Sequence, residues 1–223
     1  MSTENNVKNR MIEYVLNNAK KGCLEDIVSK IDYFCWQGSH NEGNWLMNIG
    51  DKKGDILANE IYKKQPQNVL ELGTFCGYSA LRIISALPSD GHLYTIETIS
   101  GNIEFAKQLI NYAGVQDKIT FLHGDLASSI NEIKNKYNIN FFDCVFIDHE
   151  KEIYLSDFQL LETSKLLTIG SIIIADNVLY PGSPEYKTYV TTNQDKYETV
   201  IHETTVEYTK NLADQVLITT IKS

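Results

Sequence analysis

Long apolar runs are missing from this sequence of 223 residues. Its longest apolar stretches, such as Ser171 to Ala175, fall far short of the roughly 20 residues that span a bilayer. Residues 1–18 are polar and lack the uninterrupted apolar segment of a secretory signal peptide. We therefore expect a cytoplasmic protein that has no membrane partner.

Basic residues and paired cysteines are also scarce. The chain has 20 Lys and Arg against 29 Asp and Glu, a formal charge of −9, so it offers no basic surface for phosphate backbones. We therefore expect no nucleic-acid partner, and no obligate protein partner is evident. The absence of C-x-x-C spacing favours small buried side chains over disulfides or thiolate metal ligands for the four cysteines, Cys23, Cys35, Cys76 and Cys144.

With only four prolines and no internal repeat, the sequence shows no linker that divides it. It predicts a single domain, in which residues 1–66 form a helical extension and residues 67–223 an α/β core. In the extension, apolar residues recur at three- and four-residue spacing over 7–19 and 24–35, which is typical of amphipathic helices. A third helix is expected over 54–64, before Pro66.

Beyond Pro66, short apolar runs alternate with amphipathic segments. Regular alternation of strands and helices predicts a doubly wound parallel sheet that is covered on both faces. Two last segments, rich in Val, Ile, Thr and Tyr, predict a C-terminal antiparallel hairpin, giving an α/β, mostly parallel seven-stranded sheet. The strands are expected at 68–72, 92–97, 119–123, 141–147, 171–175, 197–208 and 215–221, and the helices between them at 79–86, 101–112, 126–137 and 154–167.

A glycine-bearing turn, Glu71 to Gly77, follows the first expected strand. Gly73 and Gly77 would let the backbone approach a ligand closely, but their spacing is not the G-x-G-x-x-G of a dinucleotide site, which argues against a nicotinamide oxidoreductase. Glu97 ends the second strand, where a carboxylate can accept hydrogen bonds from ribose hydroxyls. Alone, the turn is compatible with an ordinary tight connection and Glu97 with a solvated carboxylate; together they indicate a nucleoside cofactor.

Polar side chains also end two later strands. Asp148 follows the apolar run 141–147, and Asp176 and Asn177 follow 171–175. Three oxygen ligands without a nearby thiolate suit a hard cation, Mg²⁺ in particular, that also contacts substrate. The alternative for either aspartate is that it caps the helix that follows.

Four separate motifs resemble those of the catechol O-methyltransferases. They are Trp45 to Gly54, Glu71 to Ser79, Ile147 to Lys151 and Ala175 to Val178, in the family's order and at near-family spacing. The likeness covers nearly the whole chain, from about Arg10 to the last strand. It implies a class I methyltransferase-like Rossmann fold, S-adenosylmethionine as methyl donor, Mg²⁺ as the required ion and a small catechol as substrate.

The resemblance also implies roles for individual residues. Lys151 would act as general base on the hydroxyl to be methylated, and Glu207 would hold the other hydroxyl. The implied metal ligands are Asp148, Asp176 and Asn177; the residues around the donor are Met47, Asn48, Ile49, Glu71, Gly73, Tyr78, Ser79, Glu97, Asp125, Asp148 and His149; those around the substrate are Trp45, Lys151, Asn177, Pro181 and Glu207.

The chain departs from the family pattern at three places. Glu150 stands where Trp commonly follows the Asp-His pair, Leu126-Ala127 stands where a Ser-Gln pair lies near the adenine, and the polar segment 37–44 looks like a longer loop. Two alternatives therefore stay open: a cation-dependent methyltransferase of caffeoyl-type esters, and a non-catalytic nucleoside-binding protein.

Overall fold

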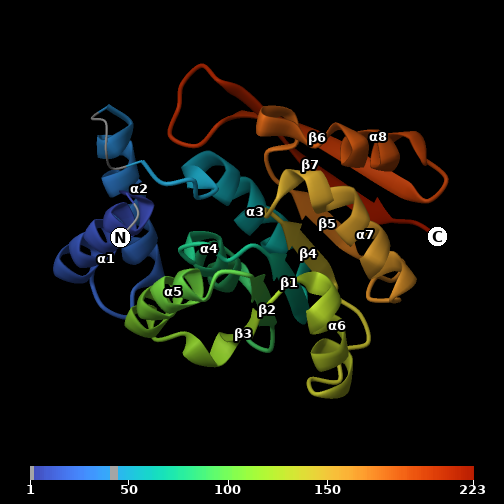
Figure 1. Ribbon diagram of the computed structural model, residues 1–223, viewed down its shortest axis with the longest axis horizontal. Helices are drawn as coiled ribbons and strands as arrows, with labels where there is room; N and C mark the ends of the chain where they lie inside the picture. The colour runs from blue at the N-terminus through green and yellow to red at the C-terminus, as the bar shows by residue number, and fades with distance from the viewer. Residues whose placement is uncertain (1–2, 41–44) are drawn as a thin grey trace.

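A computed structural model of the protein describes residues 3–40 and 45–223 (Figure 1). Its centre is a seven-stranded sheet in the order β3-β2-β1-β4-β5-β7-β6. The first five strands in this order are parallel, and β7 runs antiparallel to both β5 and β6. The strands are β1 (Asn68–Leu72), β2 (His92–Glu97), β3 (Ile119–His123), β4 (Cys144–Ile147), β5 (Ile172–Ala175), β6 (Tyr197–Thr205) and β7 (Ala213–Ile221). The expected doubly wound sheet with a terminal hairpin is confirmed.

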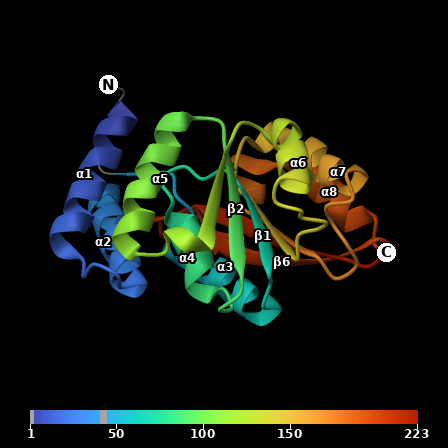
Figure 2. The ribbon, with the colours of Figure 1, turned by 90° about the horizontal axis from the view of Figure 1, so that it is seen from below.

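Helices cover both faces of the sheet (Figure 2). On one face lie α1 (Thr3–Asn18), α2 (Leu24–His40), α3 (Gly50–Lys64), α4 (Tyr78–Ala86) and α5 (Ser100–Ala113). On the other lie α6 (Leu126–Asn135), α7 (Tyr154–Thr163) and α8 (Pro184–Thr192). Three short helical turns occupy Gln116–Lys118, Lys151–Ile153 and Val178–Gly182. None of the described helices is long and apolar enough to cross a membrane.

The central strands are apolar on both sides because both faces of the sheet are covered. Neighbouring residues Val69 and Leu70 of β1 are both fully buried, one in each of the two hydrophobic clusters. In β4, Phe146 and Ile147 are divided in the same way. The apolar run therefore stops only where the strand leaves the core, and the next residue emerges at the carboxyl edge of the sheet.

Several expected boundaries are wrong. The strand expected over 141–147 begins only at Cys144, although the backbone of Asp143 still bonds to Asn68 and Ile172. The carboxylate of Asp143 accepts the backbone N–H groups of Gln67 and Asn68. The helix expected over 154–167 ends at Thr163, with Lys165 in a left-handed conformation (φ 57°).

Other differences involve helices. The helix at 184–192 was not expected, since it shows little apolar periodicity, and α3 begins at Gly50 rather than at 54. Residues 37–40 of the expected loop belong to α2, and residues 41–44 lie outside the described part of the chain.

Candidate active site

A cleft of about 720 Å³ opens at the carboxyl ends of β1, β2, β4 and β5, on both sides of the point where the strand order reverses. Its position and size are typical of a small-molecule site in an open α/β sheet. The structure brings most of the predicted site residues into its wall: Trp45, Met47, Asn48, Ile49, Gly73, Tyr78, Ser79, Glu97, Asp125, Asp148, His149, Lys151, Asn177, Pro181 and Glu207.

Two predicted residues, Glu71 and Asp176, are not part of the wall and are buried in the protein. Glu71 accepts hydrogen bonds from the hydroxyls of Ser79 and Thr95, each at 2.6 Å. Burial raises the pKa of Glu71 to about 8. Through this contact with Ser79, which lines the cleft, Glu71 supports the wall.

The glycines of the turn allow close contacts between chain segments. Gly73 has φ 99°, and a Cβ there would lie 2.6 Å from the carbonyl oxygen of Asp148. At Gly77 (φ 84°), a Cβ would lie 2.9 Å from Cβ of Ala106 on α5. Gly73 therefore lets the turn after β1 pack directly against the segment after β4.

Glu97 is held in place at the cleft wall. Its two carboxylate oxygens accept the backbone N–H groups of Phe75 at 2.9 Å and of Ile99 at 2.8 Å, and the residue is only 7% exposed. The interpretation as a solvated surface carboxylate is therefore wrong. Each oxygen keeps a lone pair for a further donor, such as a ribose hydroxyl.

Residues without an expected role complete this half of the cleft. Phe75 and Asn102 line it, and both contact Lys8 of α1. The Lys8 Nζ lies 2.6 Å from Asn102 Oδ1 and 4.2 Å from the centroid of the Phe75 ring, at cation–π distance. Lys8 is 2% exposed although it belongs to the first helix of the chain. Nothing local in the sequence marks this contact, because 94 residues separate Lys8 from Asn102.

The segment that carries Met47 and Asn48 is tied to the C-terminal hairpin. Asn48 Oδ1 accepts the backbone N–H of Gly50 at 2.8 Å and lies 2.8 Å from the hydroxyl of Tyr208. The same hydroxyl lies 3.0 Å from Asp32 Oδ1, and burial raises the pKa of Asp32 to about 6. Met47 itself is 61% exposed at the cleft.

The predicted metal ligands emerge from adjacent strands. Ile147 pairs with Ala175, so Asp148 and Asp176 each follow a residue of the same register pair. Neither aspartate caps a helix: the residues before the following helices are Glu150, Ile153 and Asn177. The helix-cap alternative is therefore wrong for both.

Asp176 is an unusual buried carboxylate. It is 1% exposed, and neither of its side-chain oxygens accepts a hydrogen bond from the described residues. Lys53 Nζ lies 2.9 Å from Oδ2 and forms a buried ion pair with it. Burial raises the pKa of Asp176 to about 7 in spite of this pair. The Lys53 ammonium thus compensates the buried charge of Asp176 only in part, and a metal cation would supply the rest.

Asn177 presents an amide oxygen beside this carboxylate. Its backbone is left-handed (φ 53°), and its Nδ2 donates to Asp214 Oδ2 at 2.9 Å, which leaves Oδ1 as the free end of the amide. No three His, Cys, Asp or Glu side chains within 3–40 and 45–223 gather into a metal-binding group. The fit to a hard cation therefore rests on two carboxylates and one amide oxygen.

Lys151 is fixed next to Asp148. Its Nζ lies 2.9 Å from Asp148 Oδ1 and 2.6 Å from the hydroxyl of Tyr154. The Tyr154 hydroxyl is buried and lies 3.1 Å from the carbonyl oxygens of both Ile147 and Asp176. The amine is thus connected to the ends of β4 and β5 at once.

The residues expected near an adenine lie after β3 and β4. Asp125 is the N-cap of α6 and accepts the backbone N–H of Ser128 at 2.8 Å. His149 stacks on Tyr154 with centroids 5.2 Å apart, and its Nε2 lies 2.8 Å from Asp157. Glu150 is exposed at the cleft, so no aromatic ring follows His149.

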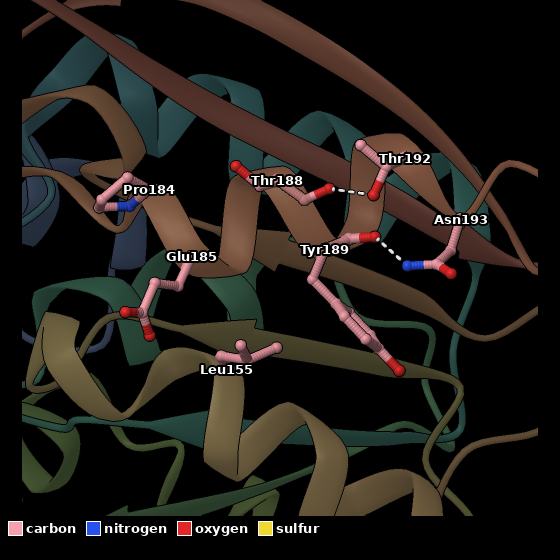
Figure 3. Close-up of a pocket in the computed structure, with 7 residues that line it drawn as sticks. All are labelled: Leu155, Pro184, Glu185, Thr188, Tyr189, Thr192 and Asn193. Carbon is pink, nitrogen blue, oxygen red and sulfur yellow. Dashed lines mark hydrogen bonds between the residues drawn. The ribbon is translucent and has the colours of Figure 1, made fainter.

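A second hollow lies between α7 and α8 (Figure 3). Two of its polar side chains, Thr192 and Asn193, bond to backbone carbonyl oxygens of α8 itself, at 2.7 and 2.8 Å. It gathers no set of groups suited to catalysis. The residues around it are Leu155, Pro184, Glu185, Thr188, Tyr189, Thr192 and Asn193.

Comparison with known proteins gives a consistent result. Residues 24–220 match the model of the O-methyltransferase family. Catechol O-methyltransferase B of Danio rerio is 39% identical over 201 residues, which cover 90% of this chain and 74% of the relative. Catechol O-methyltransferase of Mus musculus is 37% identical with the same coverage.

Two solved structures show the same fold. An O-methyltransferase from Bacillus cereus in complex with SAH gives a TM-score of 0.72 at 21% identity, covering 91% of this chain and 92% of the other. The O-methyltransferase TomG from Streptomyces achromogenes, in complex with SAM, gives 0.71 at 21% identity with both chains fully covered.

The contact at Gly73 makes a first prediction. Gly73→Ala should lower the free energy of unfolding by roughly 2 kcal/mol or more, because the new methyl group meets the Asp148 carbonyl and φ is positive. Urea unfolding measures the loss. Gly101→Ala is the control, since nothing lies within 4 Å of a Cβ there; an equal loss in both variants would contradict the role of the contact.

Burial of Glu71 makes a second prediction. Because its pKa rises from 4.5 to about 8 on folding, the folded state holds the proton more tightly, and Glu71 makes stability fall as the pH rises from about 4.5 to 8. Glu71→Gln should flatten the pH dependence of the unfolding free energy in that window. Glu104→Gln, at an exposed site on α5, should leave the wild-type slope. An unchanged slope in Glu71→Gln would contradict the prediction.

Proposed function

Because the chain belongs to the O-methyltransferase family, we propose that it transfers a methyl group from S-adenosylmethionine to one hydroxyl of a small catechol and requires Mg²⁺. The family, expected from four sequence motifs, is confirmed by the comparisons. One observation carries the proposal: Glu97 lines the same cleft as Asp148, Asn177 and Lys151. That cleft thus has a half suited to a nucleoside and a half suited to a cation.

The donor half is assigned to the turn after β1 and the end of β2. Bound S-adenosylmethionine would supply a methyl group on a sulfonium: the acceptor oxygen bonds to the methyl carbon as the carbon–sulfur bond breaks, and S-adenosylhomocysteine leaves as a neutral thioether without a covalent enzyme intermediate. Glu97 would accept hydrogen bonds from the ribose hydroxyls, and Tyr78 and Ser79 would contact the methionine part. Met47, Asn48, Ile49, Gly73, Asp125, Asp148 and His149 would enclose the rest. The protein's contribution is alignment.

Asp148, Asp176 and Asn177 would hold the magnesium ion. When bound there, Mg²⁺ stabilises a phenolate, whose parent phenol loses its proton only near pH 10 in water. The two oxygens of Asp176 without hydrogen bonds and the free amide oxygen of Asn177 support this assignment.

Lys151 would accept the proton of the hydroxyl to be methylated. Its contacts with Asp148 and Tyr154 hold the amine at the cation side of the cleft. Glu207 would accept a hydrogen bond from the second hydroxyl. Trp45 and Pro181, both exposed at the cleft, would form apolar walls for the aromatic ring. The proposal includes a cytosolic location, which the four free cysteines support.

The direct test is an assay for the methylated product. With S-adenosylmethionine, Mg²⁺ and a catechol, mass spectrometry should detect the monomethyl ether, and a chelator should abolish it. A monophenol is the control and should react far more slowly, because it lacks the second hydroxyl. Faster turnover of caffeoyl-type esters than of simple catechols would favour the alternative substrate, and absence of any product would favour a binding protein.

Two variants separate the roles within the site. Lys151→Ala should bind the donor with near wild-type affinity but lower kcat by roughly 10²- to 10⁴-fold, since it removes the base. Asp148→Ala should abolish activity at ordinary Mg²⁺ concentrations, mainly because it weakens the binding of Mg²⁺. Any remaining activity should require a higher Mg²⁺ concentration. Calorimetric titration of the donor accompanies both. Lys196→Ala, at an exposed lysine outside the cleft, is the control. Equal loss of donor affinity in the first two variants would contradict separate roles.

A further inference from the structure

A buried lysine with no expected role, Lys53, lies among three carboxylates, those of Asp176, Glu207 and Asp214. Lys53 on α3 is 1% exposed, and its Nζ lies 2.9 Å from Asp176 Oδ2. The same atom lies 3.0 Å from Asp214 Oδ2 and 3.3 Å from Glu207 Oε2. Burial alone would lower the pKa of Lys53, but the three carboxylates raise it above its ordinary value. Lys53 is therefore a fixed positive charge among three acids.

Asp214 connects this lysine to a proposed metal ligand. It is fully buried, and its Oδ2 accepts hydrogen bonds from Lys53 Nζ and from Asn177 Nδ2. Its Oδ1 accepts the backbone N–H of Tyr180 at 3.0 Å. Both oxygens of Asp214 are thus engaged by donors, and Asn177 is oriented by its nitrogen so that its oxygen stays available.

Glu207 is held by the same helix. A Cβ at Gly50, the first residue of α3, would lie only 2.7 Å from Cβ of Glu207, so the helix begins directly against this residue. Lys53, three residues later, reaches Glu207 Oε2. Glu207 lines the cleft, so its carboxylate lies between the buried ammonium and the space for substrate.

The charges of the cluster match one divalent cation. Four carboxylates and two ammonium groups give a formal charge of −2. Hard divalent cations take carboxylate oxygens as ligands, and the Lys53 ammonium occupies the space against three of these carboxylates, at 2.9 to 3.3 Å from each. The six residues, all within the described part of the chain, are Asp148, Asp176, Glu207, Asp214, Lys53 and Lys151.

We propose that Lys53 is a positioning residue that keeps Glu207 and Asp214 out of the ligand set of the cation. This rests on the proposed function, in which Asp148, Asp176 and Asn177 bind the ion. The Lys53 ammonium makes hydrogen bonds to Glu207 and Asp214 and an ion pair with Oδ2 of Asp176. It thereby reserves Glu207 for the substrate, while Oδ1 of Asp176, which no described residue contacts by a hydrogen bond, stays open to the metal.

The test measures Mn²⁺ binding to the protein without donor or catechol, by the electron paramagnetic resonance signal of free Mn²⁺. Lys53→Met should bind Mn²⁺ about tenfold more tightly than the wild type, since freed carboxylates join the ion and raise the charge of its ligand set. Lys52→Met is the matched control: it removes the same charge from the neighbouring, exposed lysine and should change the dissociation constant less than about twofold.

A double variant identifies the carboxylate that moves. If Glu207 joins the ion when Lys53 is lost, Lys53→Met combined with Glu207→Gln should return to the Mn²⁺ affinity of Glu207→Gln alone. If circular dichroism shows that Lys53→Met folds poorly, a second double variant, Lys53→Met with Asp214→Asn, replaces it. This variant removes one charge of each sign, so it leaves fewer buried carboxylates uncompensated. This pair should still bind Mn²⁺ more tightly than Asp214→Asn alone.

The contrary results are distinct. Unchanged or weaker Mn²⁺ binding in folded Lys53→Met, or a gain that persists in full when both the Glu207 and the Asp214 carboxylates are replaced by amides, overturns the role of Lys53 while the proposed function stands. A wild-type protein that binds no Mn²⁺ in the presence or absence of a catechol refutes the metal-dependent function itself, and with it the inference.

Discussion

The site depends on one carboxylate that the fold buries without a hydrogen bond. Asp176 leaves the core at the end of β5, where it is 1% exposed. A buried charge of this kind opposes folding unless another charge compensates it. Lys53 compensates part of it, yet the pKa of Asp176 still rises to about 7. A bound metal cation would compensate the rest of this buried negative charge. Ionisable groups with strongly shifted pKa values concentrate at functional sites.

The order of the strands determines which residues lie near Asp176. β1 lies between β2 and β4, so the donor half and the cation half meet at the turn after β1. Gly73 is the contact between them, because its backbone packs on the carbonyl of Asp148. A methyl donor and an acceptor oxygen must be aligned to within a fraction of an ångström to react. The close backbone contact provides a rigid reference for that alignment.

Features that depend on a local sequence pattern could be predicted, such as strands and the residues that end them. Features that depend on contacts between distant residues could not. Asp148, Asp176 and Glu97 could be predicted because each ends an apolar strand, and parallel strand ends gather at one edge. The complete burial of Glu71 could not be predicted, because both faces of β1 are covered and its hydroxyl partner Thr95 lies 24 residues away. Lys53 could not be assigned, since 161 residues separate it from Asp214.

The two ends of the chain close the cleft, and this has a thermodynamic consequence. Lys8 of α1 contacts Phe75 and Asn102 in the donor half, whereas Glu207, between β6 and β7, lies in the cation half. Residues 45 and 47–49 ahead of α3 line the cleft and α1 contacts its wall, so the segments before β1 support the site as well as cover the sheet. Because these walls come together only when both ends are folded, bound ligands stabilise the whole chain rather than one segment of it. Donor and substrate affinity are consequently coupled to global stability, so a variant far from the cleft that loosens α1 or the hairpin weakens binding without touching a ligand.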